Sequence, residues 1–103
     1  MGLLNRRTRG AERTQKVEKD IAVINRLGLH ARPAAMFVRI ASRYHCEVWV
    51  AKDGEEVNGK SIMGLMMLAA GQGSKLHLRC EGPDAEKALV DLEELINARF
   101  HED

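Results

Sequence analysis

The segment from Lys75 to Cys80 alternates polar and apolar residues, and this alternation constrains the fold more than any other feature of the chain. In an extended strand, Leu76, Leu78 and Cys80 point to one side and the polar residues between them point to the other. Such a strand belongs to a sheet with one face in the core and one face in solvent. We therefore expect a layer of helices to cover the apolar side.

Three other segments are predicted to be strands. Residues 17–25 carry valine and isoleucine on both sides, and residues 46–50 combine β-branched and aromatic side chains. Asp53-Gly54 is a hairpin turn signal that leads into a return strand over residues 55–59. Because this return strand is short and polar, it suits an edge of the sheet.

Two longer segments are predicted to be amphipathic helices. The first contains the apolar run from Ala34 to Ile40 and extends to about Arg43. The second begins at Gly82-Pro83-Asp84, with Asp84 as the expected N-cap. Its apolar residues recur on one face with a period of 3.6 residues: Ala85, Ala88, Leu89, Leu92, Leu95, Ile96 and Phe100.

A shorter helix is predicted from Ile62 to Leu68, with Ser61 as its N-cap and Gly71-Gln72-Gly73 at its end. At 100° per residue its apolar residues fall on two sides, with Ile62, Met63 and Met66 on one and Leu65, Leu68 and Ala69 on the other. A helix that covers a sheet needs only one apolar side. The methionine-rich side is therefore either additional core or an exposed docking surface.

The order of these elements, β-α-β-β-α-β-α, predicts an α+β fold, an open-faced two-layer sandwich with a four-stranded antiparallel sheet and three helices on one face. Residues 17–103 form one domain. Residues 1–16 are basic and poor in apolar residues, which predicts a disordered tail; with no apolar stretch, it is not a signal peptide. A net charge of +1 and four aromatic residues give no indication of nucleic-acid binding. The longest apolar run is too short for membrane insertion.

Two cysteines without a secretory signal predict a cytoplasmic protein. His45, Cys46, His77 and Cys80 are residue types that bind zinc. In a strand, however, His77 and Cys80 point to opposite faces because an odd number of residues separates them. We expect no metal and no cofactor.

The stretch Gly28-Leu29-His30-Ala31-Arg32-Pro33 is the strongest candidate for a chemical site. Pro33 belongs in the first turn of a helix, so His30 lies at or just before a helix N-terminus, where free N–H groups and the dipole favour an anion. Arg32 adds a planar cation suited to phosphate oxygens. Together they indicate a histidine that is itself phosphorylated. The alternative is a capping histidine beside a surface arginine.

Two motifs, Gly28–Ala34 and Lys60-Ser61-Ile62-Met63-Gly64, occur together in this chain. With both in this order, the chain resembles the HPr family of histidine-containing phosphocarriers of the bacterial phosphoenolpyruvate-dependent sugar phosphotransferase system. The resemblance covers about residues 17–103 and agrees with the predicted order of elements. It implies a monomeric phosphoryl carrier rather than an enzyme.

The resemblance also implies roles for individual residues. His30 is the residue phosphorylated on Nδ1 (pros-phosphohistidine) by enzyme I and discharged to EIIA-type acceptors, and Arg32 stabilises the phosphate. Ser61 matches the serine modified by HPr kinase/phosphorylase. Ile62, Met63 and Met66 match the patch that binds partner proteins.

Two features favour a regulatory alternative. The run from Asn25 to Gly28 and the segment from Phe100 to Asp103 resemble NPr, the nitrogen-branch relative, whereas Lys60–Gly64 resembles the kinase-regulated members. The alternative is a regulatory adaptor that acts mainly by phosphorylation-dependent protein binding.

Overall fold

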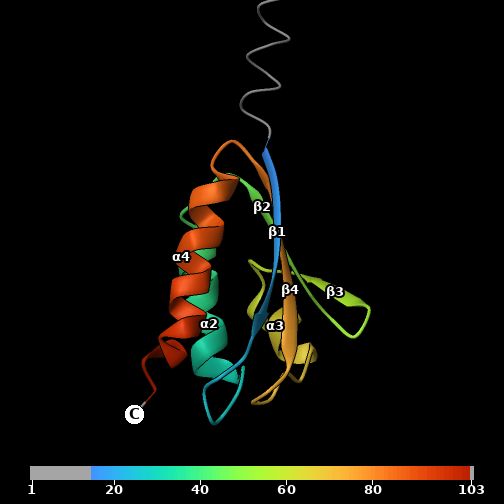
Figure 1. The fold of residues 1–103 in the computed structure, drawn as a ribbon, viewed down its shortest axis with the longest axis vertical. Coiled ribbons are helices and arrows are strands. Elements are labelled where there is room, and N and C mark those ends of the chain that lie inside the picture. The colour runs from blue at the N-terminus through green and yellow to red at the C-terminus, as the bar shows by residue number, and fades with distance from the viewer. Residues whose placement is uncertain (1–14, 103) are drawn as a thin grey trace, which may run out of the picture.

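The computed structural model describes residues 15–102, which form two layers (Figure 1). One layer is an antiparallel sheet of β1 (Gln15–Ala22), β2 (Glu47–Lys52), β3 (Glu55–Asn58) and β4 (Lys75–Gly82). The other contains α2 (Ala31–Ala41), α3 (Ile62–Met67) and α4 (Ala85–Asn97), and a 3-10 turn, η1 (Arg99–His101), follows α4. The predicted order and the predicted α+β sandwich are confirmed. No helix within the described residues is long and apolar enough to cross a membrane.

The strands are ordered β1-β4-β2-β3, and every neighbouring pair is antiparallel. β1 pairs with β4 along its whole length, from Gln15 opposite Gly82 to Ala22 opposite Lys75. In the described part of the chain β3 pairs only with β2, so the predicted edge strand lies at the edge of the sheet.

The alternation in β4 divides the sheet into two faces, as predicted. Leu76, Leu78 and Cys80 are buried beneath the helices, while His77 and Arg79 lie on the open face. There the Arg79 guanidinium lies 5.6 Å from the centre of the Trp49 ring and forms ion pairs with Glu56 and Glu81. The side of the sheet that faces away from the helices therefore carries paired charged side chains.

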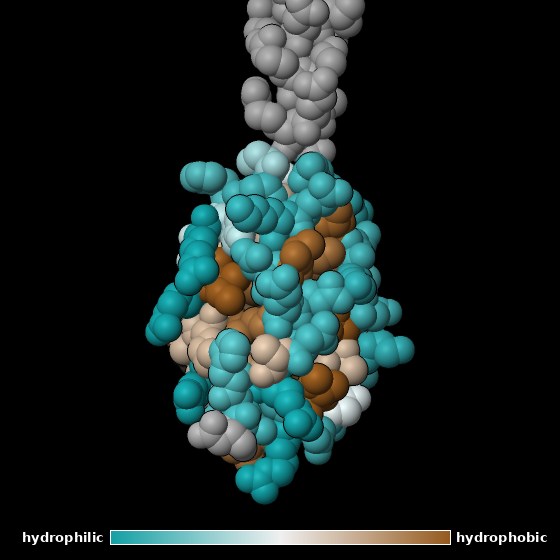
Figure 2. All heavy atoms as spheres, turned by 60° about the vertical axis from the view of Figure 1, so that its left-hand side comes forward, coloured by the Kyte–Doolittle hydropathy of each residue, from teal (hydrophilic) through white to brown (hydrophobic). Residues whose placement is uncertain are grey.

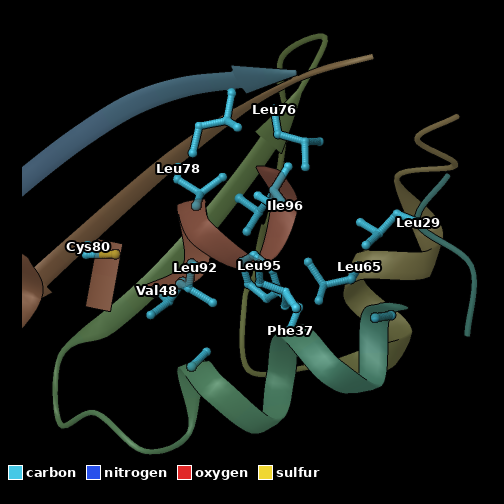
Figure 3. Packing of buried hydrophobic residues seen from close by; sticks show 14 of the residues in the cluster. Leu29, Phe37, Val48, Leu65, Leu76, Leu78, Cys80, Leu92, Leu95 and Ile96 are labelled. Atoms are coloured by element: carbon cyan, nitrogen blue, oxygen red, sulfur yellow. The ribbon is translucent and has the colours of Figure 1, made fainter. Parts of the chain in front are cut away.

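The helices bury one side each, because apolar residues recur every three or four positions. α2 buries Phe37 together with smaller residues, and α4 buries Leu92, Leu95 and Ile96. These side chains meet Leu76 and Leu78 of β4 and Leu65 of α3 in a single core, shown in Figure 3. On the outside of the helix layer, hydrophilic residues predominate and the hydrophobic ones form separate patches (Figure 2).

The boundaries of β1 differ from the prediction. A strand was expected over residues 17–25, but β1 spans Gln15–Ala22 because β4 continues to Gly82 and offers backbone partners up to that point. Gln15 and Lys16, assigned by sequence to the tail, therefore belong to the sheet. The remaining tail residues lie outside the described part of the chain.

Two helices also end earlier than predicted. α2 ends at Ala41, with Ser42 as its C-cap, rather than near Arg43. α3 ends at Met67, and the predicted terminator Gly71-Gln72-Gly73 does not end it. The backbone leaves the helical conformation instead just after the C-cap Leu68, at Ala69, which adopts a φ of +50°. The prediction relied on glycine being the usual residue in this conformation, and here alanine takes it.

Asp84 precedes α4 as predicted, but its side chain does not cap that helix. Its carboxylate accepts hydrogen bonds from the backbone N–H groups of His45 and Cys46, each at 2.9 Å, and so fastens the start of α4 to the segment before β2. Phe100, predicted on the apolar face of α4, is buried but lies in η1.

Candidate functional site

His30 lies at the end of a tight loop between β1 and α2. The loop turns at Gly28, whose φ of +73° suits glycine, and whose added Cβ would lie only 2.6 Å from the Ala70 carbonyl oxygen. The N–H of Leu29 donates to the same oxygen at 2.8 Å, and the Leu29 side chain is buried. These contacts hold the backbone just before His30 against the segment that follows α3.

His30 is the N-cap residue of α2, as predicted. Its carbonyl oxygen accepts the first helical hydrogen bond, from Ala34, but its side chain makes no capping bond and is exposed. The helix has no intrahelical acceptor for the N–H groups of Ala31 and Arg32, and no acidic residue occupies its first turn. The imidazole therefore stands beside unpaired donors at the positive end of the helix dipole.

Two open hollows meet at His30. One, of about 220 Å³, is lined by His30 and Arg32 together with Leu27, Pro33, Phe100 and Glu102. The other, of about 270 Å³, is lined by His30 and residues at the end of α3: Leu27, Leu29, Met66, Ala69, Ala70 and Gly71. The structure thus brings the predicted pair, His30 and Arg32, to one surface and connects that surface to α3.

α3 presents an exposed apolar side. The side chains of Ile62, Met63 and Met66 are exposed, Met63 by 76%, whereas Leu65 on the opposite side is fully buried. Of the two predicted explanations for the methionine-rich side, additional core is therefore wrong. Met67 extends the exposed surface, although it was not predicted to belong to the patch.

Ser61 is the N-cap of α3, as predicted, and its Oγ accepts a hydrogen bond of 3.0 Å from the N–H of Gly64. Ser61 and Met66 lie at opposite ends of this short helix. The apolar surface therefore extends from the Ser61 hydroxyl to the hollow beside His30.

A family model described as "PTS HPr component phosphorylation site" matches residues 17–98. The chain belongs to the HPr family. Membership supports a phosphocarrier role in the phosphotransferase system, and a carrier rather than an enzyme.

Individual HPr proteins agree with this assignment. The chain is 57% identical to the phosphocarrier protein HPr of Pseudomonas aeruginosa over 81% of this chain and 93% of that protein. It is 49% identical to HPr of Neisseria meningitidis serogroup A, over 84% and 97% respectively. The crystal structure of an HPr from Thermoanaerobacter tengcongensis matches with a TM-score of 0.81 and 47% identity, covering 84% of this chain and 98% of the other.

Two polar residues beside this site, Asn25 and Glu102, were not predicted to belong to it. The Glu102 carboxylate accepts hydrogen bonds from the loop before His30, and Asn25, the first loop residue that it binds, is fully buried. Burial opposes ionisation of Glu102, but the donors on Asn25, Leu27 and Arg26 more than offset it, so the pKa of Glu102 lies below its ordinary value. The one local signal was a polar Asn25 directly after a run of apolar residues.

The histidines and cysteines considered as zinc ligands do not form a metal site in the structure. Burial raises the pKa of the Cys46 thiol to about 11 and that of the Cys80 thiol to about 12, so both are protonated residues of the core. His77 lies on the open face of the sheet, between Asp20 and Glu18 at 2.7 Å each. Within residues 15–102, no three histidine, cysteine or acidic side chains are grouped to hold a metal ion.

Proposed function

We propose that this chain is a cytoplasmic, monomeric phosphocarrier that accepts a phosphoryl group from enzyme I on Nδ1 of His30 and passes it to EIIA-type acceptors. The observation that carries the proposal is the exposed imidazole of His30 at the N-terminus of α2, beside Arg32 on one hollow. Family membership supports the same role.

The proposed transfer needs little from the protein beyond position and charge. The Nδ1 lone pair of a neutral imidazole attacks phosphorus, the new N–P bond forms, and the bond between phosphorus and the donor histidine of enzyme I breaks. The transferred oxygens then meet the guanidinium of Arg32 and the unpaired N–H groups at the start of α2. Because the site is open and holds a single arginine, it stabilises the phosphate without trapping it.

Incubation with phosphoenolpyruvate and catalytic amounts of enzyme I tests this role. We expect the intact mass to increase by one phosphoryl group, labile in acid and stable in alkali, and His30→Ala to abolish the increase. His45→Ala is the matched control, since His45 is exposed but lies outside any helix N-cap. Phosphate on His45, His77 or His101 while His30 is intact would contradict the assignment.

The exposed side of α3 is the proposed docking surface for enzyme I and for the acceptors. Ile62, Met63 and Met66 present flexible apolar side chains, and Met66 lines a hollow shared with His30. A partner that covers this surface is thereby brought next to the imidazole. Methionine suits a surface that several partners share, because its side chain adapts to different shapes.

Ser61 is the proposed regulatory site, modified by HPr kinase/phosphorylase. A phosphate there adds a charge of about −1.5 to −2 beside Ile62 and Met63, on a surface that partners must desolvate. Its oxygens replace the hydroxyl as acceptors for the Gly64 N–H, so folding is preserved. We expect phosphorylated Ser61 to slow phosphorylation of His30 at an unchanged melting temperature, with Ser61→Asp giving a smaller effect and Ser61→Ala none on the rate. Equal rates for the phosphorylated and unmodified proteins would exclude this role.

A second candidate function is that of a regulatory adaptor. The observation in its favour is the position of Ser61 at the edge of an exposed apolar surface. The chain is also similar to Crh, the catabolite repression HPr of Bacillus subtilis: the solution structure of Crh matches with 44% sequence identity and a TM-score of 0.59, covering 78% of this chain. An adaptor would bind its partner only when Ser61 is phosphorylated and would do so equally well with His30→Ala. A carrier would lose its function with that substitution.

A further inference from the structure

Glu102 ties the end of the fold to the loop that leads to His30. Its Oε1 accepts a hydrogen bond of 2.7 Å from the N–H of Arg26, and its Oε2 accepts bonds of 3.1 Å from the N–H of Leu27 and from the side-chain amide of Asn25. The Asn25 amide also donates to the carbonyl oxygen of Gly28 at 2.9 Å. One carboxylate therefore holds three successive residues of this loop.

The backbone before Glu102 adopts an uncommon conformation to reach the loop. Arg99, Phe100 and His101 have φ values of +59°, +52° and +56°, and none of them is glycine. Such residues persist in left-handed conformations only where their surroundings enforce them, and they concentrate at functional sites. Here the enforcement comes from Phe100, whose ring is buried, and from the bonds of Glu102. The turn connects the end of α4 to Glu102, whose carboxylate meets the loop before His30.

The turn and His30 face a common space. Phe100 and Glu102 line the hollow of about 220 Å³ to which His30 and Arg32 also contribute. Between the amides that Glu102 holds and His30, the chain contains only Gly28 and Leu29. A shift of the held amides would thus be passed to the imidazole through a short stretch that includes a glycine.

The geometry points to Glu102 as a positioning residue that fixes residues 25–28 and, through them, holds the imidazole of His30 in place for phosphoryl transfer. The inference rests on the proposed function of His30 and extends it to a residue that does not touch the phosphate. A carboxylate is required because three N–H donors converge on two acceptor oxygens. A glutamine of the same shape offers one acceptor oxygen, and its own N–H₂ group would face donors.

Glu102→Gln is therefore the main test, with Glu55→Gln as the matched control. Glu55 is an exposed glutamate on the edge strand β3, so its replacement removes the same charge away from the loop. Three quantities are measured for each protein: the melting temperature, the backbone amide NMR signals of Arg26 and Leu27 with the imidazole signals of His30, and the rate at which enzyme I phosphorylates His30. Glu102→Asp keeps the charge but shortens the reach.

We expect Glu102→Gln to shift the amide signals of Arg26 and Leu27 and the imidazole signals of His30, and to slow phosphorylation about tenfold, within the hundredfold that a misplacement of about 1 Å can cost. Glu102→Asp should restore the rate only in part, because the group must reach the amides as well as carry charge. Glu55→Gln should leave all three quantities unchanged.

A lower melting temperature with unchanged His30 signals and an unchanged rate would overturn the inference and make Glu102 a structural anchor only. Full rescue by Glu102→Asp would also overturn it, since charge alone would then suffice. If wild-type protein accepts no phosphate at His30, the proposed function fails; the His30 signals of Glu102→Gln still decide whether Glu102 positions the imidazole.

Discussion

Among single residues, Arg32 tests the proposed chemistry most directly beside His30 itself. Its side chain is exposed in the first turn of α2 and lines the hollow that His30 shares. Arg32→Lys keeps the positive charge but loses the planar pair of donors that matches phosphate oxygens. We expect the phosphorylation rate of His30 to fall several-fold while the melting temperature stays unchanged. Stopped-flow or quench measurement with enzyme I decides this, and a wild-type rate would remove Arg32 from the site.

Three glycines, Gly28 before His30 and Gly71 and Gly73 in the segment between α3 and β4, allow two causes of destabilisation to be measured separately. Gly28→Ala combines a positive φ with a clash against the Ala70 carbonyl, so it should lower the free energy of unfolding by about 3 kcal/mol. Gly73→Ala has a positive φ but open space, and should cost about 1 kcal/mol. Gly71→Ala has neither, and should change stability by less than about 0.5 kcal/mol. Urea denaturation measures all three, and equal values for Gly28→Ala and Gly73→Ala would show that the clash is relieved.

The sequence predicted residues of the site whose roles depend on their immediate neighbours. His30 and Ser61 are caps, and capping is decided within one helical turn, so both were found at the expected positions. Glu102 was missed because its partners lie about 75 residues away, and no local rule connects them. Asp84 fits the local rule for a helix cap, but its carboxylate accepts hydrogen bonds from the N–H groups of His45 and Cys46 instead of from the start of α4.

At the scale of a secondary-structure element, α3 separates stability from binding. Met63→Glu places a charge on a side chain that is 76% exposed, so we expect a change in unfolding free energy below about 1 kcal/mol and a clear loss of affinity for enzyme I. Leu65→Glu, two residues away, buries the same charge in the core and should prevent folding. Calorimetric titration with enzyme I and thermal melts distinguish the two. A large loss of stability in Met63→Glu would mean that the patch is part of the core.

The elements themselves were predicted in number, type and order, because their hydrophobic periods are distinct. Their ends were less accurate, since ends depend on what lies alongside. β1 extends as far as β4 supplies partners, and α3 stops at a left-handed alanine where glycines nearby were the expected signal. Exposure of Ile62, Met63 and Met66 could not be derived from period alone, because the period gives two apolar sides without saying which one is covered.

For the whole molecule, His77 and Asp84 are two of the groups that make the free energy of unfolding depend on pH. His77 donates hydrogen bonds to the carboxylates of Asp20 and Glu18, and these bonds raise its pKa. Its contribution to the free energy of unfolding is therefore present below the unfolded pKa of about 6.5 and is lost as pH rises through the higher folded pKa. Burial opposes ionisation of Asp84, but the N–H groups of His45 and Cys46 more than offset it and lower its pKa. The contribution of Asp84 to the free energy of unfolding is present above the unfolded pKa of about 3.9 and is lost as pH falls through the lower folded pKa.

We therefore expect maximal stability between about pH 5 and about pH 6 from these two groups. Urea unfolding across pH 3 to 9, on wild type and two variants, checks the assignment. His77→Gln should flatten the decline above about pH 6.5, and Asp84→Asn should make the acid decline shallower. A His77→Gln profile that still declines in this range would assign the alkaline effect to another group.

The position of β1 in the sheet has a consequence for how the chain is made. Within residues 15–102, β4 is the only strand that pairs with β1. Roughly 70 residues separate Gln15 from Gly82, and at roughly 5 to 20 residues per second a ribosome takes roughly 4 to 14 seconds to synthesise them. During that interval the first strand has no partner, and Val17 and Ile21 are the large apolar residues that it exposes. Their neighbours Lys16, Glu18, Lys19 and Asp20 are all charged. This density of charge keeps an unpaired nascent strand from joining strands of other chains before its own partner emerges.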